Sequence, residues 1–432
     1  MGRGEDVGCG EVAAGPGGTP RRGACCGGVM PAGTATAGHR AVREQLALSG
    51  HGARLLREWV ADEPSSGMAR GLLVLATGDT LDDDALKAEL VTAFEDASGE
   101  WERSLVYGIY LHTHRQYLLA ADHLATHLTR FPADVTAVMM LGAFHACGRA
   151  DYREAGDRLV EEQCTLAGPE SWPWVSRLAW VRAEQGRVDE AWELACRALA
   201  LYPRSGVAVH ARAHAEHELG AGPDSTVFLD RWLAEDPGAV QYRHLNWHAA
   251  LQSLAAGDFA DARRRVDTVL EASDVGMRSA TNWRMLLCRQ PPARTTPLEH
   301  VRELLAAPEG MAEVFHTFQL ALALAVQGAT DDLQALARTA EVDERPAYAG
   351  VLAPVVRALA HLCADRPGPA VDILTGLETD GLGGVRVERE IIQDTLARAL
   401  VVQGDGEGAA RLLHQRTTGR RHHRYEDLLL AP

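Results

Sequence analysis

Apolar residues recur with a helical period along nearly the whole chain from Arg40 onward. Ala, Leu, Arg and Glu dominate this part of the sequence, and runs of β-branched residues are scarce. An apolar stripe that returns every three to four positions, built from such helix-forming residues, is typical of amphipathic helices that pack side by side. Short clusters rich in Gly, Pro and Asp separate the stripes, and they read RFPAD, LYPRSG, GAGPD, EDPGA and AAGDF. The sequence therefore predicts an all-α protein whose helices are joined by short turns.

The turn clusters also return at a fixed period. Pro203 and Pro237 are 34 residues apart, which is the length of a tetratricopeptide repeat. The segment that ends at Pro203 has small residues, among them Ala179, Gly186 and Ala191, where two paired helices of such a repeat approach closely. The predicted fold is a right-handed α-solenoid of tetratricopeptide-like helix hairpins with a concave inner surface.

Two regions of the chain differ in composition. Residues 1–38 are rich in Gly, Ala and Thr and contain few large apolar side chains, so we expect them to be disordered. Residues 39–432 are expected to form the α-solenoid, with a capping helix in the C-terminal stretch RRHHRYEDLLL (420–430) whose basic face would be solvated. The repeat signature weakens towards the C-terminus, where we expect hairpins at 311–327 with 330–341, 347–364 with 367–377, and 386–403 with 406–416.

Charge and composition narrow the classes of partner. The formal net charge of −16 argues against nucleic-acid binding, because phosphate contacts need clustered Lys and Arg. No apolar run approaches the roughly 18 residues of a membrane span, and the N-terminus lacks the apolar core of a signal peptide, so we expect no membrane partner. The eight cysteines include no CxxC pair, which favours reduced thiols in a cytoplasmic protein.

Histidines cluster in the middle of the chain. His210, His214 and His217 fall within an arc of roughly 60° on one helix face, because successive residues are about 100° apart. His244 and His248 form a second i, i+4 pair on the first helix of the following hairpin. The core positions of both helices remain apolar, so the histidines do not replace core residues.

The repeat phase predicts where these side chains point. The first helix of each tetratricopeptide unit lines the concave groove, and His210, His214 and His217 occupy groove-facing positions of that helix. In the next unit His244 also points inward, whereas His248 is expected nearer the rim. The preceding unit adds inward positions at Trp180 and Glu184. We therefore predict a groove lined by imidazoles, an indole and a carboxylate.

Two histidine pairs on adjacent helices suit more than one chemistry. The imidazoles of His210, His214, His244 and His248 are placed to hold a divalent metal, for which we consider zinc or iron. They are equally suited to proton transfer, since imidazole titrates near neutrality. Histidine is also tolerated on a wet helix face without any special role, and the sequence leaves these three readings open.

Three functions are compatible with this groove. The first is a binding scaffold that holds a small molecule or a peptide, with or without a metal ion. The second is a metal- or histidine-dependent enzyme of the hydrolase, lyase or isomerase type that acts on a small molecule. In that enzyme the four histidines and Glu184 would be catalytic and Arg389 would orient an anionic group. The third is a regulatory partner protein without pocket chemistry.

The stretches YPRSGVAVHARAHAEHELG and HLNWHAALQSLAAGDFADA carry a more specific likeness. With their paired HxxxH motifs one repeat apart, they resemble the tetratricopeptide repeat protein 38 family, and the likeness extends from about Leu105 to GGVRVEREIIQDTLARAL near the C-terminus. The resemblance implies a closed, curved helical solenoid and maps the four histidines, Glu184 and Arg389 onto family positions. It brings no defined activity with it.

Several groove positions depart from that family's pattern. His217 stands where the family tends to have Glu, Gln319 stands where it has His, and Glu390 stands where Asp is usual, while His316 lies one turn before Gln319. The four central histidines match the family's pattern, whereas surrounding groove positions differ from it. This combination is expected for a member adapted to a different ligand, and loss of an ancestral activity would explain it equally well. The residues expected to contact the ligand are Trp180, His217, Trp247, Arg389, His316 and Gln319.

Overall fold

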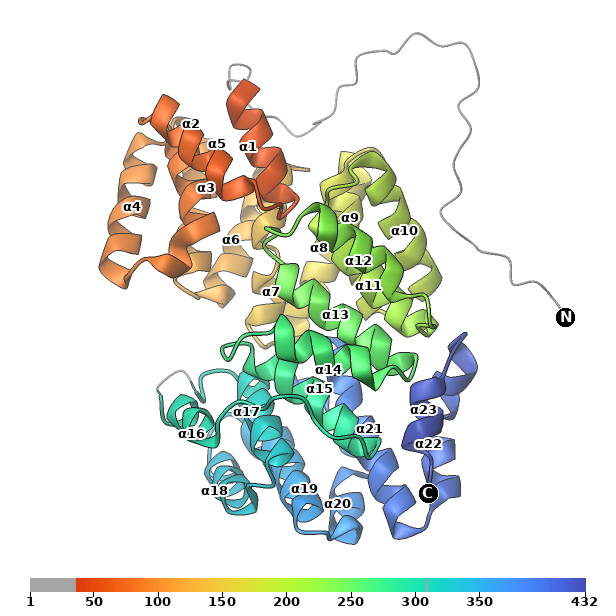
Figure 1. Ribbon diagram of the computed structural model, residues 1–432. Coiled ribbons are helices and arrows are strands. Elements are labelled where there is room, and N and C mark those ends of the chain that lie inside the picture. The colour runs from red at the N-terminus through yellow and green to blue at the C-terminus, as the bar shows by residue number, and fades with distance from the viewer. Residues whose placement is uncertain (1–35, 308–309) are drawn as a thin grey trace, which may run out of the picture.

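A computed structural model describes residues 36–307 and 310–432, and in this part of the chain helices and turns occur without any strand. Figure 1 shows the helices stacked side by side along a curved path, with the N-terminal helices at the top of the view and the C-terminal ones at the bottom. The all-α prediction is confirmed. Helix α1 begins at Thr36. Residues 1–35, which make up most of the segment 1–38 predicted to be disordered, lie outside the described residues.

The N-terminal helices lead into a less regular stretch. They are α1 (Thr36–Leu46), α2 (Gly52–Asp62), α3 (Gly67–Thr77), α4 (Asp83–Asp96), α5 (Gly99–Thr113) and α6 (Tyr117–Arg130), with the 3-10 turn η1 (Gly78–Thr80) after α3. The 3-10 helix η2 (Val135–Met140) and the one-turn helix α7 (Ala143–Ala146) then precede α8 (Ala150–Ala167).

The rest of the chain consists of helix hairpins. They are α9 (Trp172–Glu184) with α10 (Val188–Leu201), α11 (Gly206–Leu219) with α12 (Thr226–Glu235), α13 (Tyr242–Ala255) with α14 (Phe259–Thr268), and α15 (Val275–Leu287) with α16 (Leu298–Ala306). The three hairpins predicted near the C-terminus follow. They are α17 (Val314–Val326) with α18 (Thr330–Glu341), the π-helical turn η3 (Tyr348–Leu352) and α19 (Ala353–Cys363) with α20 (Pro367–Leu374), and α21 (Arg386–Gln403) with α22 (Gly406–Gly419). A 3-10 turn η4 (Asp380–Leu382) precedes α21, and α23 (Arg424–Leu429) ends the chain.

Local signals in the sequence set the ends of the central helices. The hydroxyl of Ser205 accepts a hydrogen bond from the amide of Ala208 at 3.1 Å and caps the N-terminus of α11. Gly186 adopts a φ of 74° in the turn between α9 and α10, a conformation that glycine enters without strain. Fully buried alanines such as Ala179, Ala195 and Ala211 let neighbouring helices approach closely. This is the packing that the small residues of the repeat predicted.

The two ends of the chain both fold back onto the central hairpins. The connection after α1 is bound to α11 and to the turn after α12, because Ala47 and Leu48 accept backbone hydrogen bonds from Gly206 and Val240 at 2.8 and 3.0 Å. At the other end, α21 contacts α11 and α15, and α23 contacts α13. The last hairpin therefore lies against the first helices of earlier hairpins, with contacts between residues 103 and 173 positions apart in the chain.

Buried ion pairs hold α21, α22 and α23 together. Arg416 lies 2.6 Å from Asp394 and 3.1 Å from Glu426, and Arg420 lies 2.6 Å from both Glu390 and Glu426. The side chain of Arg420 is only 6% exposed. The solvated basic face predicted for this stretch is therefore wrong at Arg420, since the carboxylates of α21 and α23 turn that residue inward.

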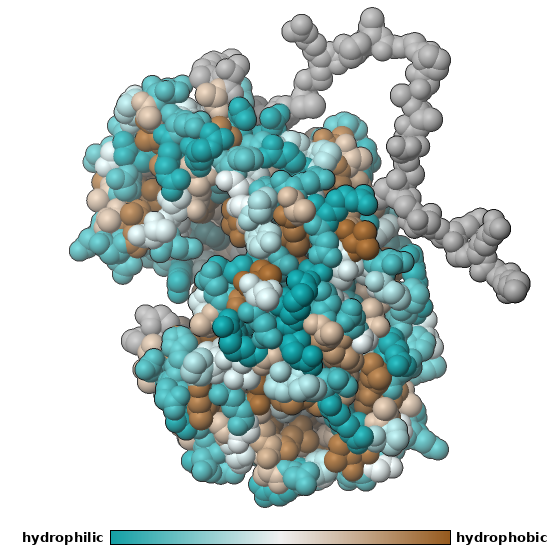
Figure 2. Space-filling view, in the orientation of Figure 1, coloured by the Kyte–Doolittle hydropathy of each residue, from teal (hydrophilic) through white to brown (hydrophobic). Residues whose placement is uncertain are grey.

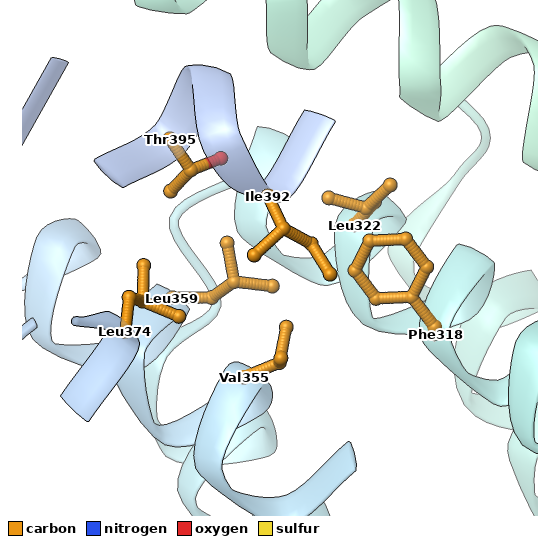
Figure 3. Close-up of a pocket in the computed structure, with 7 residues that line it drawn as sticks. All are labelled: Phe318, Leu322, Val355, Leu359, Leu374, Ile392 and Thr395. Atoms are coloured by element: carbon orange, nitrogen blue, oxygen red, sulfur yellow. The ribbon is translucent and has the colours of Figure 1, made fainter. Parts of the chain in front are cut away.

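The C-terminal core is apolar and tightly packed. Figure 3 shows side chains of α17, α19, α20 and α21 directed towards one another around a small cavity. The cavity measures about 10 Å³ and is lined by Phe318, Leu322, Val355, Leu359, Leu374, Ile392 and Thr395. It is at the lower limit for a single water and offers one polar side chain, so it is a packing defect and not a ligand site.

The molecular surface is mostly polar. Figure 2 shows hydrophilic residues over much of the visible face, with apolar ones scattered among them and more frequent towards the C-terminal helices. Within the described ranges, no helix combines the length and the apolar character that crossing a bilayer requires.

The buried arginine clamp predicts a large stability effect. Replacing Arg420→Gln leaves Glu390 and Glu426 without one of their cations, and we expect unfolding to become easier by roughly 3 kcal/mol. Urea denaturation followed by tryptophan fluorescence measures this change. Arg421→Gln is the matched control, because its exposed side chain should contribute less than about 0.5 kcal/mol. Equal effects of the two substitutions would contradict the clamp.

Candidate metal centre

Helices α11 and α13 each carry one histidine pair, and their direct packing brings the two pairs together. Val209 and Ala213 on α11 share a buried apolar cluster with Leu245 and Ala249 on α13. Each of these residues immediately precedes or follows a histidine in the chain, so the apolar seam fixes the position of the imidazoles. His210 and His244 are 34 residues apart, which is the length of one tetratricopeptide repeat.

The four imidazoles converge through their Nε2 atoms. The Nε2 of His210 lies 3.0 Å from that of His214 and 2.9 Å from that of His244. The Nε2 of His248 lies 3.2 Å from that of His244. One ligand atom each of His210, His244 and His248 lies within 4.8 Å of the others. The structure thus brings together the two histidine pairs that the sequence analysis placed on adjacent helices.

Neutral imidazoles cannot satisfy these contacts by themselves. Each neutral ring carries one hydrogen for its two nitrogens, so a given Nε2 either donates or accepts. The Nε2 atoms form a row in the order His214, His210, His244, His248, in which donors and acceptors must alternate. Two of the four atoms then carry a hydrogen. Two hydrogens cannot serve three contacts, so one contact has no hydrogen bond. A cation bound by His210, His244 and His248 removes this conflict, because the lone pairs of these three nitrogens can then point towards it.

Burial keeps the imidazoles uncharged. It lowers the pKa of His244 to about 4, with a smaller contribution from His214. It also lowers the pKa values of His210 and His248 well below the ordinary range, and the neighbouring imidazoles add to the effect. Neutral histidine is the form that binds metals, so these nitrogens are available as ligands at neutral pH.

The spacing of the nitrogens matches that of a metal site. Zn–N bonds of about 2.0–2.1 Å in a tetrahedral centre place neighbouring nitrogens about 3.3 Å apart. The observed contacts of 2.9 to 3.2 Å differ from this by a few tenths of an ångström. These three contacts are therefore close to the spacing of metal ligands, and the ligand atoms of the three-histidine group of His210, His244 and His248 lie within 4.8 Å of one another.

Glu184 of α9 lies behind one of the imidazoles. Its carboxylate is 3.5 Å from the Nδ1 of His214, and it accepts a hydrogen bond from the amide of Arg386 at 2.9 Å. Burial raises the pKa of Glu184, but the interaction with His214 and the bond from Arg386 outweigh it, so the pKa is lowered overall. A carboxylate at Nδ1 orients the ring and makes Nε2 a better ligand or base.

The other predicted ligand contacts near the cluster differ in their surroundings. His217 lies 3.1 Å from Glu390 of α21, and burial lowers its pKa despite this carboxylate. The indole of Trp247 packs on His244 and His248 with ring centroids 5.3 and 5.0 Å away, and it is almost fully buried. It therefore supports the imidazoles from behind.

Trp180 and Arg389 lie on two sides of Glu184. Trp180 is on α9, where its ring meets His145 edge-on at 4.7 Å. Arg389 is on α21 and donates hydrogen bonds to the carbonyls of Gly383 and Gly384, at 3.4 and 2.5 Å. Trp180 precedes Glu184 by one turn of α9, and the charge of Arg389 acts on the carboxylate of Glu184.

Two predicted ligand contacts lie apart from the imidazoles. His316 and Gln319 are on α17, and Gln319 packs against Gly276 of α15. Among the described residues, neither makes a hydrogen bond, ion pair or ring contact with the four histidines. The rim position expected for His248 is wrong, since its side chain is 1% exposed. Helix α21 lies against α11 and α15, so the inner wall here is covered.

Sequence reasoning missed three polar residues on this inner wall. Arg177 lies on α9 two turns before Glu184, and its guanidinium stacks on Trp180 at 4.7 Å from the ring centroid. His145 and Asp157 come from α7 and α8, and their nearest side-chain atoms are 3.5 Å apart. The seven-residue spacing from Arg177 to Glu184 was a usable signal. His145 follows the irregular helix η2, where the repeat phase is lost.

The comparisons with known proteins give two distant structural similarities and no family. No family model and no curated protein matches the chain. Among solved structures it is similar to the crystal structure of the P58(IPK) TPR domain, with 14% identity over 77% of this chain and 96% of that one and a TM-score of 0.24. It is also similar to Naa15/Naa10 bound to HypK-THB, with 13% identity over 87% and 67% and a TM-score of 0.22. Such low values carry no argument about the site, and the tetratricopeptide-like character rests on the hairpins and their period.

The neutral imidazoles predict a loss of stability on acidification. The folded-state pKa of His244 is about 4 against an ordinary 6.5, so the unfolded chain binds more protons between these pH values. Stability is therefore complete above about pH 6.5 and falls towards pH 4, by about 3 kcal/mol for this residue alone. Denaturation of the metal-free protein across this range measures the loss. His244→Gln should flatten the profile, and an unchanged slope in that variant would contradict the assignment.

Proposed function

We propose that this chain is a metal-binding, tetratricopeptide-like protein whose histidine cluster holds a divalent ion, zinc or iron, and offers it to a small molecule. The observation that carries the proposal is the convergence of four Nε2 atoms, one of whose three contacts has no hydrogen of its own. The apolar seam between α11 and α13 stabilises that convergence without help from polar partners. A buried nitrogen without a hydrogen bond destabilises the folded protein unless a bound ligand at the centre compensates for it.

The enclosure of the site favours a small molecule over a peptide. A peptide groove must remain open along its length, but α21 lies against α11 and α15 on the side to which the histidines point. The ion pair of Arg386 with Glu218 at 3.2 Å, together with the contact of His217 with Glu390, fastens α21 there. His210 and His244 are partly exposed, whereas His214 and His248 are buried, so access is from the side of the first two.

The same geometry supports a second candidate function, that of a metal-dependent enzyme. His210, His244 and His248 form a compact three-histidine group, and His214 lies beside it with Glu184 at its Nδ1. Catalytic zinc sites use three protein ligands and leave a position for water or substrate. A bound ion would supply Lewis-acid activation there. His214, oriented by Glu184, would move a proton to or from the reacting group in a hydrolase, lyase or isomerase reaction.

We also propose membership of the tetratricopeptide repeat protein 38 family and a cytoplasmic location. The paired HxxxH motifs one repeat apart and the contact of Glu184 with His214 support the family proposal. The cysteines in the described part of the chain form no disulfide with one another, which is compatible with a reducing compartment. The acidic charge supports the absence of a nucleic-acid partner.

Metal analysis tests the proposed function directly. Protein purified without a histidine tag should contain about one zinc or iron ion per chain by inductively coupled plasma mass spectrometry. His244→Ala and His248→Ala should each lose it, and the melting temperature of these variants should no longer rise on metal addition. His300→Ala is the control, since that side chain is exposed on α16. A metal-free wild type that takes up neither ion would sink the proposal.

One variant separates the two candidate functions. If His214 acts as a base beside a three-histidine site, His214→Ala should keep the metal while the activity of the loaded protein falls by about a hundredfold or more. If His214 is the fourth ligand of a closed binding site, the same substitution should reduce metal affinity as strongly as His244→Ala does. Equilibrium dialysis with zinc measures which of the two holds.

A further inference from the structure

The C-terminal unit of α21, α22 and α23 is joined to the rest of the molecule in two different ways. Ile391 of α21 shares a buried apolar cluster with Trp283 of α15 and Phe318 of α17. In the described part of the chain, no buried apolar side chain of this unit shares a cluster with one of α11. Ion pairs join the unit to α11 instead, among them His217–Glu390 at 3.1 Å and Glu218–Arg386 at 3.2 Å.

The segment between α22 and α23 crosses the ends of both helices that carry the histidine pairs. We call residues 420–424 the strap. The amide of Arg421 donates a hydrogen bond to the carbonyl of Leu219, the last residue of α11, at 2.7 Å. Arg424 packs on Gly257, just after α13, where an ideal Cβ would lie 3.0 Å from the Cγ of that arginine. The strap therefore fastens the C-terminal unit to the two helices whose packing forms the histidine cluster.

Two glycines after α11 make room for the strap. Gly220 has a φ of 88°, and an ideal Cβ on it would lie 2.5 Å from the carbonyl oxygen of His422 and 2.9 Å from the amide nitrogen of Arg421. A Cβ on Gly222 would lie 2.6 Å from the imidazole of His422. Backbone atoms cannot yield as the end of a flexible side chain does, so a residue larger than glycine at position 220 displaces the strap.

The strap itself is polar. Its sequence is Arg-Arg-His-His-Arg, and residues 421–424 are exposed. The buried Arg420 is paired most closely with Glu390 and Glu426, which belong to the same C-terminal unit. Separation from α11 would therefore leave these ion pairs intact, and water would replace the hydrogen bonds that are lost.

A polar seam opens more readily than an apolar one. Exposure of buried apolar surface is unfavourable in proportion to its area, whereas ions and hydrogen-bonding groups regain water when they separate. The contact of α21 with α15 and α17 is apolar, and its contact with α11 is polar. The C-terminal unit can therefore move away from α11 while it stays packed on α15 and α17.

We propose that the seam between α11 and α21 is a gate to the histidine cluster and that the strap holds it shut. In the closed state α21 lies against α11, and His214 and His217 are only 3% and 7% exposed. Release of the strap uncovers this face of α11 and lets an ion or a small molecule reach the cluster. The role of the gate in metal exchange rests on the proposed function, whereas the opening itself does not.

Gly220→Ala tests the strap, with Gly168→Ala as its matched control. The two glycines have φ values of 88° and 79°, so alanine introduces similar backbone strain at either position. A Cβ at Gly168 would have nothing within 4 Å, so only Gly220→Ala displaces the strap. Circular dichroism checks that both variants are folded.

Modification of histidines by diethyl pyrocarbonate, followed at single residues by mass spectrometry in metal-free protein, measures the opening. His214 and His217 should react about tenfold or more faster in Gly220→Ala than in the wild type, and at the wild-type rate in Gly168→Ala. His300 is exposed on α16 and should react equally in all three proteins. Zinc-loaded Gly220→Ala should also release its ion to excess chelator about tenfold faster than the wild type.

A reversible crosslink should produce the opposite change. An ideal Cβ at Gly222 would lie 3.3 Å from the Cγ of His422, so cysteines at these two positions are within reach of a disulfide. In the double variant Gly222→Cys with His422→Cys, oxidation should slow the modification of His217 by about tenfold or more, and a reductant should restore it. A loss of stability alone cannot produce this reversal.

The outcomes separate the gate from the proposed function. Protein that takes up no metal but shows these changes in histidine modification supports the gate and refutes the proposed function. Metal uptake with equal modification of His217 in Gly220→Ala and Gly168→Ala, or in the oxidised and reduced double variant, overturns the gate and leaves the proposed function in place.

Discussion

The close contact between α11 and α13 is the constraint on which the rest of the site depends. Val209, Ala213, Leu245 and Ala249 form the seam between the two helices, and each adjoins a histidine in the chain. The small side chains of Ala213 and Ala249 allow the two helices to approach closely. The imidazoles on the neighbouring face of each helix therefore point towards one another. A bulkier seam would keep the same hairpins and the same hydrophobic core, but the Nε2 atoms would no longer meet. Helix packing therefore positions the imidazoles, and burial of apolar side chains, rather than polar contacts, stabilises that packing.

Closure of the solenoid by α21 shields the histidine cluster from water. Helix α21 covers the inner wall, and the ion pairs of α21, α22 and α23 hold it in place. Removal of water makes the charged forms of His210, His244 and His248 unfavourable and strengthens any interaction with an ion that enters. Enclosure thus places the histidine cluster and the carboxylate of Glu184, which contacts His214, in one environment.

Much of this arrangement was predictable from short-range patterns. The 34-residue period and the i, i+4 spacing placed His210, His214 and His244 on facing helices, and the structure brings their Nε2 atoms together. Patterns of this kind describe a single hairpin and its immediate neighbour. They could not show that α21 returns to cover α11, which is why His248 was expected at the rim and Arg420 in solvent. His316 and Gln319 were assigned from a family likeness and not from spacing, and they lie on α17, apart from the cluster. His145 follows the irregular helix η2, where no repeat phase exists to place it.

The late position of α21 in the sequence has a consequence for how the centre is filled. During synthesis α11 and α13 emerge and pair well before α21 is made, since His217 and its partner Glu390 are separated by 173 residues. In the nascent chain the histidine nitrogens of α11 and α13 are therefore open to solvent before α21 is made. Helix α21 docks over them afterwards. Once it has docked, exchange is limited to the partly exposed edge formed by His210 and His244, or requires the last hairpin to lift away. An ion captured at the proposed centre before docking would therefore be selected by its supply during synthesis as well as by its affinity for the finished protein.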